Sequence, residues 1–594
     1  MRLTTLFTLV SVILISACRT PVVATDTASE GVTTPPNILL VVFEDMSQRI
    51  GAFGDPVATT PVLDAFASQS VIYPNTFTTA GVCAPSRAAL ITGVHQQTLG
   101  AQHMRTHAFG TEDDPAGFSI GYSAVPPEDV KAFPELLRRA GYYTFTGYGG
   151  WVISNKKDYQ FGAPFTVWDA DSVDASWRGR SDDQPFFGMI TLATTHESFL
   201  YPEAADSDDA GARSIATRNA RLLDGKQYVT DPDSVVVPAW LPDTPEVRAE
   251  IATHYDNIAF TEQKLTELLE ALEADGLANN TFVIVTTDHG DGFPRAKRTV
   301  FDSGIRVPLM IRFPDLREAG VMREDLISFV DIAPTLLALA GADRPDWLQG
   351  RVFLGPEREE PNEYVFASSD RMDAWTDRVK AIRSQRFKLI RNYIADVPLH
   401  QPVAFREPLR SMRAMRDLLA RDELAPIPQS YFETPRPDVE LYDLDTDPEE
   451  TINLAAAPEW ADVRARLERE MDDWLARTAD WSSTDEADMV DQFWPGGIQP
   501  ETGASLIEIE PKTDGIYKVQ LSPSTPGASL AWRIEEEGGG EAWKLYVSPL
   551  TFTSGACVTA RAVRYGYRAS PVVSVCLPDV HPSDSSVIER VSSQ

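Results

Sequence analysis

The segment Cys83-Ala84-Pro85-Ser86-Arg87 is followed by the apolar run 88–92 and Gly93. Pro85 suits the first turn of a helix, and Gly93 suits the residue just past its end. Cys83 would then lie just before a helix N-terminus, where unpaired N–H groups favour an anion such as a thiolate. The thiol is either a nucleophile or a small buried core residue, and the stretch alone leaves both interpretations open.

Upstream of this stretch, an unbroken apolar segment from Asn37 to Phe43 ends in the two acids Glu44 and Asp45. An uninterrupted run of this length predicts a parallel strand that is buried on both faces. Ligands bind at the carboxyl ends of such strands, and two adjacent carboxylates suit a hard divalent cation. A helix N-cap is the competing interpretation for Asp45.

Two apolar segments downstream also end in polar side chains. Residues 282–286 predict a buried strand that leads to Asp288 and His289, which are candidate metal ligands. Residues 186–195 predict another strand, and His196 follows it. This histidine is either structural or a general acid that protonates a leaving alcohol near neutral pH.

Together these segments resemble the type I sulfatase family of the alkaline-phosphatase-like superfamily. Residues 83–87, with Thr92-Gly93 after them, match the family signature, in which the cysteine is oxidised to formylglycine. The resemblance implies that Cys83 is converted by a formylglycine-generating enzyme or an anaerobic sulfatase maturase. The hydrated aldehyde would be the nucleophile that takes the sulfuryl group. Arg87 would neutralise charge around the anion and the nucleophile, and His196 would be the general acid.

The resemblance also implies a Ca²⁺ ion at the acidic end of the site. Its ligands would be Glu44, Asp45, Asp288, His289 and the formylglycine at Cys83. The family has two aspartates where this chain has Glu44-Asp45, so the glutamate would ligate through its longer arm. The ion would polarise the sulfate oxygens and the attacking hydroxyl.

Two lysines are implied as contacts of the sulfate group. The segment Asn155-Lys156-Lys157-Asp158-Tyr159 resembles a Lys-x-Asp-Tyr variant of a family motif and points to Lys156, with Lys157 as a substitute. The segment 295–308 resembles the block in which a second lysine grips the sulfate, here Lys297. A solvated loop lysine is the alternative at each position.

The fold implied is α/β: a large mixed central sheet sandwiched by helices, a smaller α+β C-terminal subdomain and an extra C-terminal β-sandwich. The sandwich is predicted from short strand segments separated by Pro, Gly and Ser. Cys557 and Cys576 lie in this unit, either as a disulfide formed outside the cytosol or as two unpaired thiols. The predicted parts are a catalytic domain at 37–375, a C-terminal subdomain at 376–482, a linker at 483–505, the sandwich at 506–580 and a tail at 581–594.

Residues 1–18 have the features of a bacterial lipoprotein signal peptide. An apolar segment follows Arg2 and is too short to span a bilayer, and Ile15-Ser16-Ala17-Cys18 resembles a lipobox. Cys18 would then carry the lipid, and residues 19–36 would form a tether. An ordinary secretory signal with an incidental Cys18 is the alternative. We expect a lipid-anchored protein of the bacterial cell envelope, in the periplasm or at the outer membrane surface.

The net charge of −34 repels nucleic acid and would equally repel a sulfated substrate. An enzyme for sulfate esters must therefore concentrate its cations locally. Arg378, Lys380, Arg383, Arg386 and Lys388 form a basic cluster, in which Arg383 and Arg386 are candidates for contacting substrate sulfates. The exposed face of a sheet is the alternative for this cluster.

The sequence thus predicts a sulfuric ester hydrolase that acts on a sulfated polysaccharide or oligosaccharide. Residues 195–198 and 237–245 resemble the N-sulfoglucosamine sulfohydrolase and bacterial polysaccharide sulfatase branch, so O- and N-sulfates are both candidates. One alternative is a phosphonate or phosphate monoester hydrolase of the same superfamily. The other is a non-catalytic glycan-binding lipoprotein with a relic site.

Overall fold

The computed structural model describes residues 35–104, 121–201, 210–373, 375–403, 406–513, 515–534, 542–578 and 590–591. The predicted signal peptide with its lipidation site Cys18, and nearly all of the predicted tether, lie outside the described residues. Most of the predicted tail lies outside them as well.

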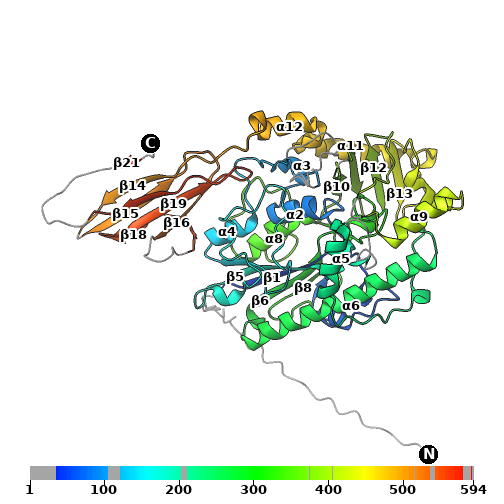
Figure 1. Ribbon diagram of the computed structural model, residues 1–594, viewed down its shortest axis with the longest axis horizontal. Helices are drawn as coiled ribbons and strands as arrows, with labels where there is room; N and C mark the ends of the chain where they lie inside the picture. The colour runs from blue at the N-terminus through cyan, green and yellow to red at the C-terminus, as the bar shows by residue number, and fades with distance from the viewer. Residues whose placement is uncertain are drawn as a thin grey trace, which may run out of the picture. The chain divides into compact units, whose positions relative to one another are not determined.

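A six-stranded mixed sheet forms the centre of the catalytic domain, with strand order β2-β8-β6-β1-β5-β4 (Figure 1). Strand β1 lies in the middle and pairs in parallel with β5 on one side and β6 on the other. Strand β8 runs antiparallel to both β6 and β2. The strands are β1 (Asn37–Phe43), β2 (Val71–Ile72), β4 (Tyr143–Thr146), β5 (Phe186–Leu192), β6 (Thr281–Thr287) and β8 (Leu309–Arg312).

Helices cover both faces of this sheet, as the apolar character of β1 requires (Figure 1). Alternate residues of β1 point to opposite faces, because the side-chain period of a strand is two. Those at 38, 40 and 42 pack with α2 (Cys83–Thr92), α4 (Phe133–Arg139) and α8 (Ile332–Leu339). Those at 39, 41 and 43 pack with α1 (Pro61–Ala67) and α6 (Pro245–Ala274).

Strand β5 ends earlier than the sequence predicts. The prediction extends it through residue 195, whereas the strand stops at Leu192 and a 3-10 turn spans Ala193–Thr195. The hydroxyl of Thr195 donates to the carbonyl of Glu44, and the N–H of Glu44 donates back to that hydroxyl at 3.2 Å. These hydrogen bonds to the Thr195 side chain replace strand pairing at residues 193–195. As a result, His196 lies beside the end of β1.

The C-terminal subdomain is a four-stranded antiparallel sheet covered by α11 (Ala461–Arg477). Apolar residues from all four of its strands pack against Leu467, Met471 and Trp474 of this helix. The strands are β10 (Val365–Ser369), β11 (Val379–Arg383), β12 (Phe387–Asn392) and β13 (Val439–Asp443). The predicted α+β character of this part is confirmed.

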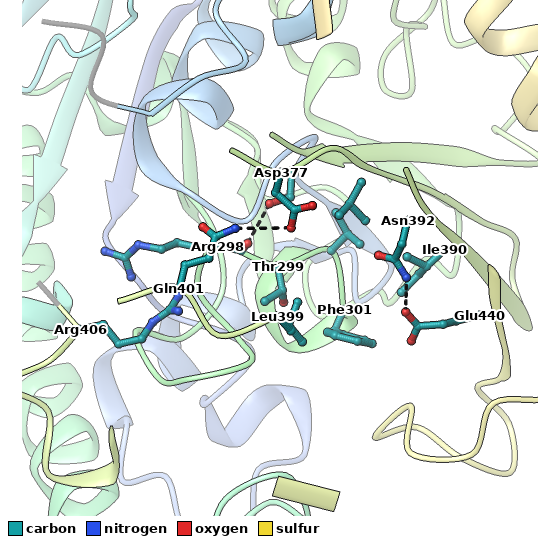
Figure 2. Close-up of a pocket in the computed structure, with 13 residues that line it drawn as sticks. Arg298, Thr299, Phe301, Asp377, Ile390, Asn392, Leu399, Gln401, Arg406 and Glu440 are labelled. Atoms are coloured by element: carbon teal, nitrogen blue, oxygen red, sulfur yellow. Dashed lines mark hydrogen bonds between the residues drawn. The ribbon is translucent and has the colours of Figure 1, made fainter. Parts of the chain in front are cut away.

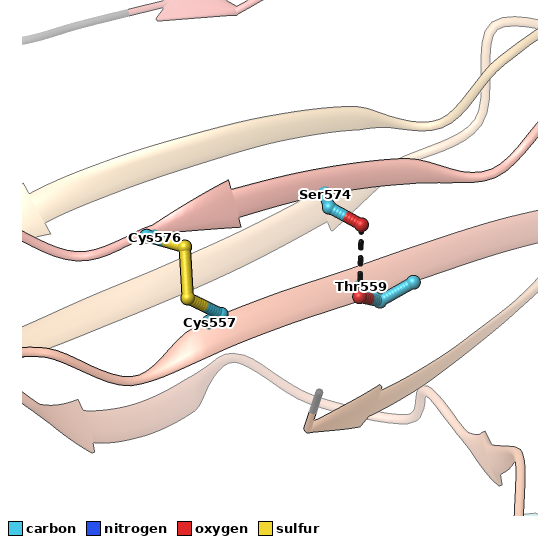
Figure 3. Close-up of a disulfide and its surroundings, with 4 residues drawn as sticks. All are labelled: Cys557, Thr559, Ser574 and Cys576. Carbon is cyan, nitrogen blue, oxygen red and sulfur yellow. Dashed lines mark hydrogen bonds between the residues drawn. A yellow bond between two sulfur atoms is a disulfide. The ribbon is translucent and has the colours of Figure 1, made fainter. Parts of the chain in front are cut away.

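Two four-stranded sheets form the C-terminal β-sandwich around a shared apolar core. In the second sheet, Cys557 and Cys576 lie opposite one another on β19 and β20 and form a disulfide (Figure 3). Ser529 and Tyr565 of this unit donate hydrogen bonds to the buried carboxylate of Glu135 on α4. The strands are β14 (Leu506–Pro511), β15 (Ile516–Ser522), β16 (Ser529–Ile534), β17 (Lys544–Leu545), β18 (Leu550–Thr553), β19 (Cys557–Val563), β20 (Val573–Cys576) and β21 (Arg590–Val591).

Shorter elements complete the described structure. They are β3 (Thr76–Phe77), β7 (Arg306–Val307) and β9 (Ile327–Ser328), which form a small sheet, and the helices α3 (Gln96–Leu99), α5 (Ala210–Leu222), α7 (Asp302–Ile305), α9 (Arg410–Ala420), α10 (Pro426–Gln429) and α12 (Glu486–Phe493). None of the helices in the described parts of the chain combines the length and apolar character that a membrane span requires. The α/β fold class predicted from the sequence is confirmed, and the domain boundaries stay predictions.

Candidate active site

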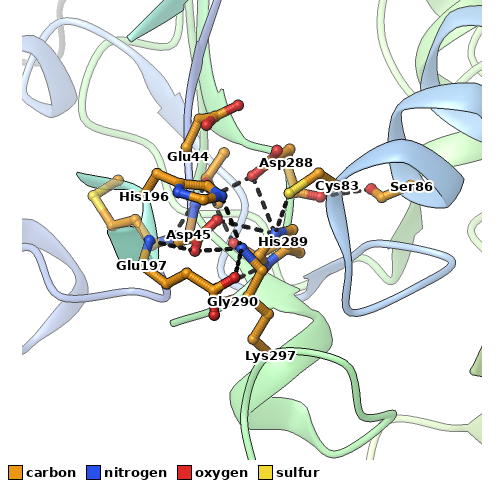
Figure 4. Close-up of polar contacts among 12 residues, drawn as sticks. Glu44, Asp45, Cys83, Ser86, His196, Glu197, Asp288, His289, Gly290 and Lys297 are labelled. Carbon is orange, nitrogen blue, oxygen red and sulfur yellow. Dashed lines mark hydrogen bonds and ion pairs between the residues drawn. The ribbon is translucent and has the colours of Figure 1, made fainter. Parts of the chain in front are cut away.

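Three parallel strands bring the predicted site residues to one edge of the central sheet. In the register of the sheet, Phe43 at the end of β1 lies level with Leu192 of β5 and with Thr287 of β6. The residues that follow these three strands therefore meet at the same edge, where open α/β sheets bind ligands. Figure 4 shows the resulting cluster, which contains Glu44, Asp45, Cys83, His196, Asp288, His289 and Lys297.

The backbone at Asp45 adopts a left-handed conformation with φ of 42°. This region is strained for most residues, but aspartate enters it more readily. The N–H of Asp45 donates to Asp288 Oδ1 at 3.2 Å, and the N–H of Asp288 donates to the carbonyl of Phe43 at 3.1 Å. These bonds couple the ends of β1 and β6, so the two carboxylates are held together by the backbone.

Cys83 is the first residue of α2 and is 2% exposed. Its Sγ lies 3.2 Å from His289 Nε2. The preceding loop is packed tightly, since a Cβ at Gly81 would lie 2.2 Å from the carbonyl oxygen of Thr299. Gly93 closes the helix with φ of 71°, in the position that its sequence predicts. The helix therefore presents Cys83 directly to the residues at the end of β6.

Arg87, one turn further along α2, bridges two carboxylates of the site. Its Nε donates to Asp288 Oδ2 at 3.0 Å, and its Nη2 donates to Glu44 Oε1 at 2.9 Å. The guanidinium is fully buried, and burial opposes its charge. The carboxylates of Asp288 and Glu44 outweigh that cost and raise the pKa of Arg87 above its usual range. Arg87 is thus a permanent cation that fixes the two acids.

The structure distinguishes the two adjacent lysines of the 155–159 segment. Lys156 Nζ lies 2.5 Å from Glu44 Oε1 and 3.9 Å from Asp288 Oδ2. Lys157 Nζ points elsewhere and lies 2.5 Å from Asp171 Oδ2, in a pair that is exposed to solvent. Burial opposes the charge of Lys156, but Asp158 is among the groups that outweigh it and raise its pKa well above the ordinary value. Lys156 is the cation that joins the cluster.

Lys297 supplies a second cation, which pairs with Asp45 rather than with Glu44. Its Nζ donates to Asp45 Oδ2 at 2.6 Å and lies 3.2 Å from His196 Nε2. It also lies 3.1 Å from Glu197 Oε1. Both terminal nitrogens of Arg298 donate hydrogen bonds to the carboxylate of Glu197.

No role was predicted from the sequence for Glu197 or Arg298. Their positions next to His196 and Lys297 are the signal that could have found them. The N–H of Glu197 also donates to Asp45 Oδ2 at 2.7 Å, so this residue touches the cluster through its backbone as well as its carboxylate. Glu197 thus helps to fix both Lys297 and Asp45, and Arg298 holds the Glu197 carboxylate in place.

The two histidines of the site experience opposite electrostatic environments. Burial lowers the pKa of His289, but the carboxylates of Asp288 and Asp45 outweigh it and raise this pKa to about 10. Burial also lowers the pKa of His196, and the nearby charge of Lys297 adds to the effect, giving about 3. The end of the cluster around His289 and its carboxylates therefore attracts cations, and the end around His196 and Lys297 attracts anions.

The acidic end fits a divalent cation. Three buried carboxylates belong to it: those of Asp45 and Asp288 each lie within 3.7 Å of His289 Nε2, and that of Glu44 is paired with Arg87 and Lys156. Asp45 Oδ1 is buried, has no hydrogen-bond partner among the described residues and lies 3.1 Å from His289 Nε2. The ligand atoms of Cys83, Asp288 and His289 all lie within 4.8 Å of one another. Carboxylate oxygens with one imidazole are the donor set of a hard cation, as the sequence predicts.

Arg383 and Arg386 form ion pairs outside the active-site cluster. Arg383 is buried and lies 3.3 Å from Asp302, and Arg386 is exposed and lies 2.6 Å from Asp443. Lys380 and Lys388 of the same basic cluster are buried in ion pairs of their own. Lys380, Arg383 and Lys388 are buried, so they do not form the exposed sheet face named as the alternative. Their ion pairs favour a structural role, and contact of Arg383 and Arg386 with substrate sulfates stays a prediction.

A cavity of about 20 Å³ lies between Arg298 and the C-terminal subdomain (Figure 2). Its walls include apolar residues such as Val379 and Ile390, the cation Arg406 and the carboxylate of Glu440. Its volume would hold a water molecule or two, not a sugar. None of the predicted catalytic or metal-binding residues lines it.

Comparison with known proteins agrees with this arrangement. Residues 36–342 match the sulfatase family model, and residues 292–400 match the C-terminal model of N-sulphoglucosamine sulphohydrolase. An ulvan-active sulfatase from Formosa agariphila is 37% identical over 570 residues, covering 92% of both chains. Human N-sulphoglucosamine sulphohydrolase is 26% identical over 484 residues, covering 75% of this chain and 91% of its own.

Solved structures agree on the fold. A crystal structure assigned as a sulfatase from Bacteroides thetaiotaomicron aligns with a TM-score of 0.52 at 17% identity, over 76% of this chain and 94% of its own. A 2-O GAG sulfatase aligns with a TM-score of 0.50 at 17% identity, over the same shares. The fold is that of the alkaline-phosphatase-like sulfatases. The chain belongs to the sulfatase family, whose members hydrolyse sulfate esters.

Proposed function

We propose that this sulfatase uses a formylglycine made from Cys83, together with a Ca²⁺ ion, to remove sulfate from a sulfated glycan. One observation carries the proposal: Cys83 lies 3.2 Å from His289 inside a buried cluster of carboxylates that is flanked by lysines. A core cysteine would be surrounded by apolar side chains. Here the thiol faces the candidate metal ligands, as a precursor of the nucleophile must.

Two groups would be added to the side chains that the structure shows. A cation held by Glu44, Asp45, Asp288 and His289 would act as a Lewis acid toward the sulfate oxygens. The hydrated aldehyde derived from Cys83 would supply the nucleophilic oxygen. The remaining residues of the cluster bind and orient the substrate around these two groups.

The flanking cations hold the anionic sulfate in place. Lys156 and Lys297 lie on either side of the carboxylates and can neutralise the charge of the transferred group. Arg87 keeps Glu44 and Asp288 in fixed positions, because it bonds to both. The sulfate is therefore held by preorganised charges, which need not reorganise during the reaction.

His196 is the candidate proton donor to the leaving oxygen. When the sulfur–oxygen bond of the ester breaks, that oxygen gains an electron pair and needs a proton. Without substrate, burial and Lys297 hold the pKa of His196 at about 3. A bound sulfate would offset the charge of Lys297 and allow His196 to carry its proton.

The proposed substrate is a sulfated sugar within a polysaccharide or its oligomers. The relative that is 37% identical is named an ulvan-active sulfatase, and the human relative is named for N-sulphoglucosamine. These names support a sulfated carbohydrate, with O- and N-sulfates as the two options. The ion pairs of Arg383 and Arg386 support a structural role for them, so the substrate contacts proposed here are Lys156, His196 and Lys297.

The experiment is sulfate release from a panel of substrates by the wild type and by Cys83→Ala. The panel holds an aryl sulfate, ulvan oligosaccharides, N-sulfoglucosamine, an aryl phosphate and a phosphonate monoester. We expect release from a sulfated sugar by the wild type, none by Cys83→Ala, and little change in thermal unfolding. Faster turnover of the phosphate or phosphonate than of the sulfates would favour a phosphate or phosphonate monoester hydrolase. If no substrate of the panel were turned over, a non-catalytic glycan-binding protein would be favoured.

We further propose export and lipid attachment at Cys18. The disulfide between Cys557 and Cys576 supports an oxidising compartment. Radiolabelled palmitate and cell fractionation test this directly. Label should enter the wild type and not Cys18→Ser, whereas equal recovery of both proteins as unlabelled soluble enzyme would contradict it.

A further inference from the structure

Most side chains of the buried cluster are shielded from solvent, and those that are not are candidates for substrate contact. Six residues of the cluster are each at most 3% exposed: Glu44, Asp45, Cys83, Asp288, His289 and Lys297. Among the described residues of the site, solvent reaches Lys156, whose side chain is 15% exposed, His196, which is half-buried, and Asp158. These three residues are therefore the candidates for contact with the part of a substrate beyond its sulfate group.

Asp158 is the most exposed of the three and the only acid among them, with a side chain that is 35% exposed. Its Oδ2 lies 3.5 Å from Lys156 Nζ, and its Oδ1 lies 3.8 Å from Arg87 Nε. Oδ1 is buried and has no hydrogen-bond partner among the residues that the structure describes. A carboxylate at the entrance of an anion-binding site weakens anion binding there, so charge neutralisation of the sulfate does not explain its presence.

The segment that carries Asp158 is anchored on both sides. Before it, the N–H of Thr191 on β5 donates to the carbonyl of Ser154 at 2.9 Å, and Ser154 is buried. After it, Tyr159 is buried in the main core, where its ring stacks on Phe161. Asp158 is therefore held at a fixed place beside Lys156, as a residue that discriminates between substrates must be.

We propose that Asp158 selects substrates by the group next to the sulfate ester. Its carboxylate accepts a hydrogen bond from a free sugar hydroxyl at the neighbouring ring position, because an ionised carboxylate offers acceptors only. It repels a sulfate or carboxylate at the same position, since like charges close together are unfavourable. This inference rests on the proposed sulfatase function and specifies the class of sugar: one whose sulfate has a hydroxyl neighbour.

The test compares three substrates: a monosulfated sugar, the same sugar with a second sulfate on the adjacent carbon, and an aryl sulfate. For the wild type we expect a kcat/KM that favours the monosulfated sugar. Asp158→Asn keeps the shape and removes the charge. It should raise the disulfated-to-monosulfated ratio of kcat/KM about tenfold or more, mainly through KM. Turnover of the aryl sulfate, which has no neighbouring hydroxyl or anion, is measured alongside as the reference for any change in binding of the sulfate group itself.

Two control variants separate selection from general electrostatics. Asp171→Asn removes a carboxylate that pairs with Lys157 outside the cluster, and it should leave the ratio unchanged. Asp158→Glu keeps the charge and should keep discrimination against the disulfated sugar. Asp158→Ser is a second neutral variant and should repeat the shift, which covers the case in which Asp158→Asn folds poorly.

An unchanged ratio in both neutral variants, with the wild type active, would overturn the role of Asp158 and leave the proposed function standing. An equal shift in Asp171→Asn would also overturn it, because bulk charge would then explain the effect. A wild type that releases sulfate from none of the three substrates would instead refute the proposed function.

Discussion

A buried carboxylate away from the active site makes stability depend on pH in a direction that can be measured. Glu250 lies on α6, is fully buried and accepts hydrogen bonds from the hydroxyl and the N–H of Ser411 on α9. Burial raises the pKa of Glu250 from 4.5 to about 7, against the opposing effect of the Ser411 hydrogen bonds. The folded state therefore binds this proton more tightly than the unfolded state does.

The sign and size of the effect follow from this difference. The stabilisation is fully present below about pH 4.5 and is lost as the pH rises through about 7. A shift of about 2.5 pH units corresponds to about 3 kcal/mol. Glu250→Gln cannot ionise, and its amide can both accept from the Ser411 N–H and donate to the Ser411 hydroxyl. The variant should thus be more stable than the wild type at pH 8, by up to about 3 kcal/mol, and similar to it at pH 4.5.

Thermal unfolding of the wild type, Glu250→Gln and Glu267→Gln between pH 4.5 and pH 8 provides the assay. Glu267 lies on the same helix with an exposed side chain and serves as the matched control, with no pH-dependent difference expected. The difference in midpoint between Glu250→Gln and the wild type should grow as the pH rises. A constant difference across this range, or one that grows toward acid, would refute the reasoning.

Three further predictions concern the site and the sandwich. Lys156→Ala should lower kcat/KM for sulfate release by about tenfold or more, whereas Lys157→Ala should change it by less than about threefold. The reason is that, of the two lysines, Lys156 joins the cluster and Lys157 pairs with Asp171. Equal losses in the two variants would contradict the assignment of Lys156 as the sulfate contact. Removing divalent cations with a chelator should lower the melting temperature and Ca²⁺ should restore it, since the proposed ion would bind only the folded site; zinc giving full restoration where Ca²⁺ fails would point to a different metal. Replacing Cys557 and Cys576 together by serine removes a bond between residues 19 apart and should destabilise the sandwich by roughly 3 kcal/mol, with kcat for an aryl sulfate unchanged; a large loss of kcat would show that the sandwich supports the site.

The strands that build the site were predictable because their sequences carry a strong signal. Residues 37–43 and 282–286 are uninterrupted apolar segments, and each becomes a central parallel strand that ends at its acidic residues. The turn after β5 was not predictable in this way. It depends on the hydroxyl of Thr195 bonding to Glu44, a residue 151 positions away.

Ion-pair partners were beyond the sequence. The motif pointed to Lys156 and left Lys157 as a substitute, and the path of the loop decides between them, because it sends Lys156 to Glu44 and Lys157 to Asp171. The basic cluster shows the same limit. Lys388 is fully buried because Asp302 and Glu450, which are distant in sequence, neutralise it. The charged residues can be identified from the sequence, but the oppositely charged residues that pair with them are brought together only in the folded chain.

The conversion of Cys83 to formylglycine is the step on which the proposed mechanism depends. The enzyme would be purified in active form, digested, and its Cys83 peptide examined by mass spectrometry. We predict that the peptide carries the aldehyde, in a fraction that rises and falls with specific activity across preparations. Full sulfatase activity in a preparation whose Cys83 is an unmodified thiol would contradict it.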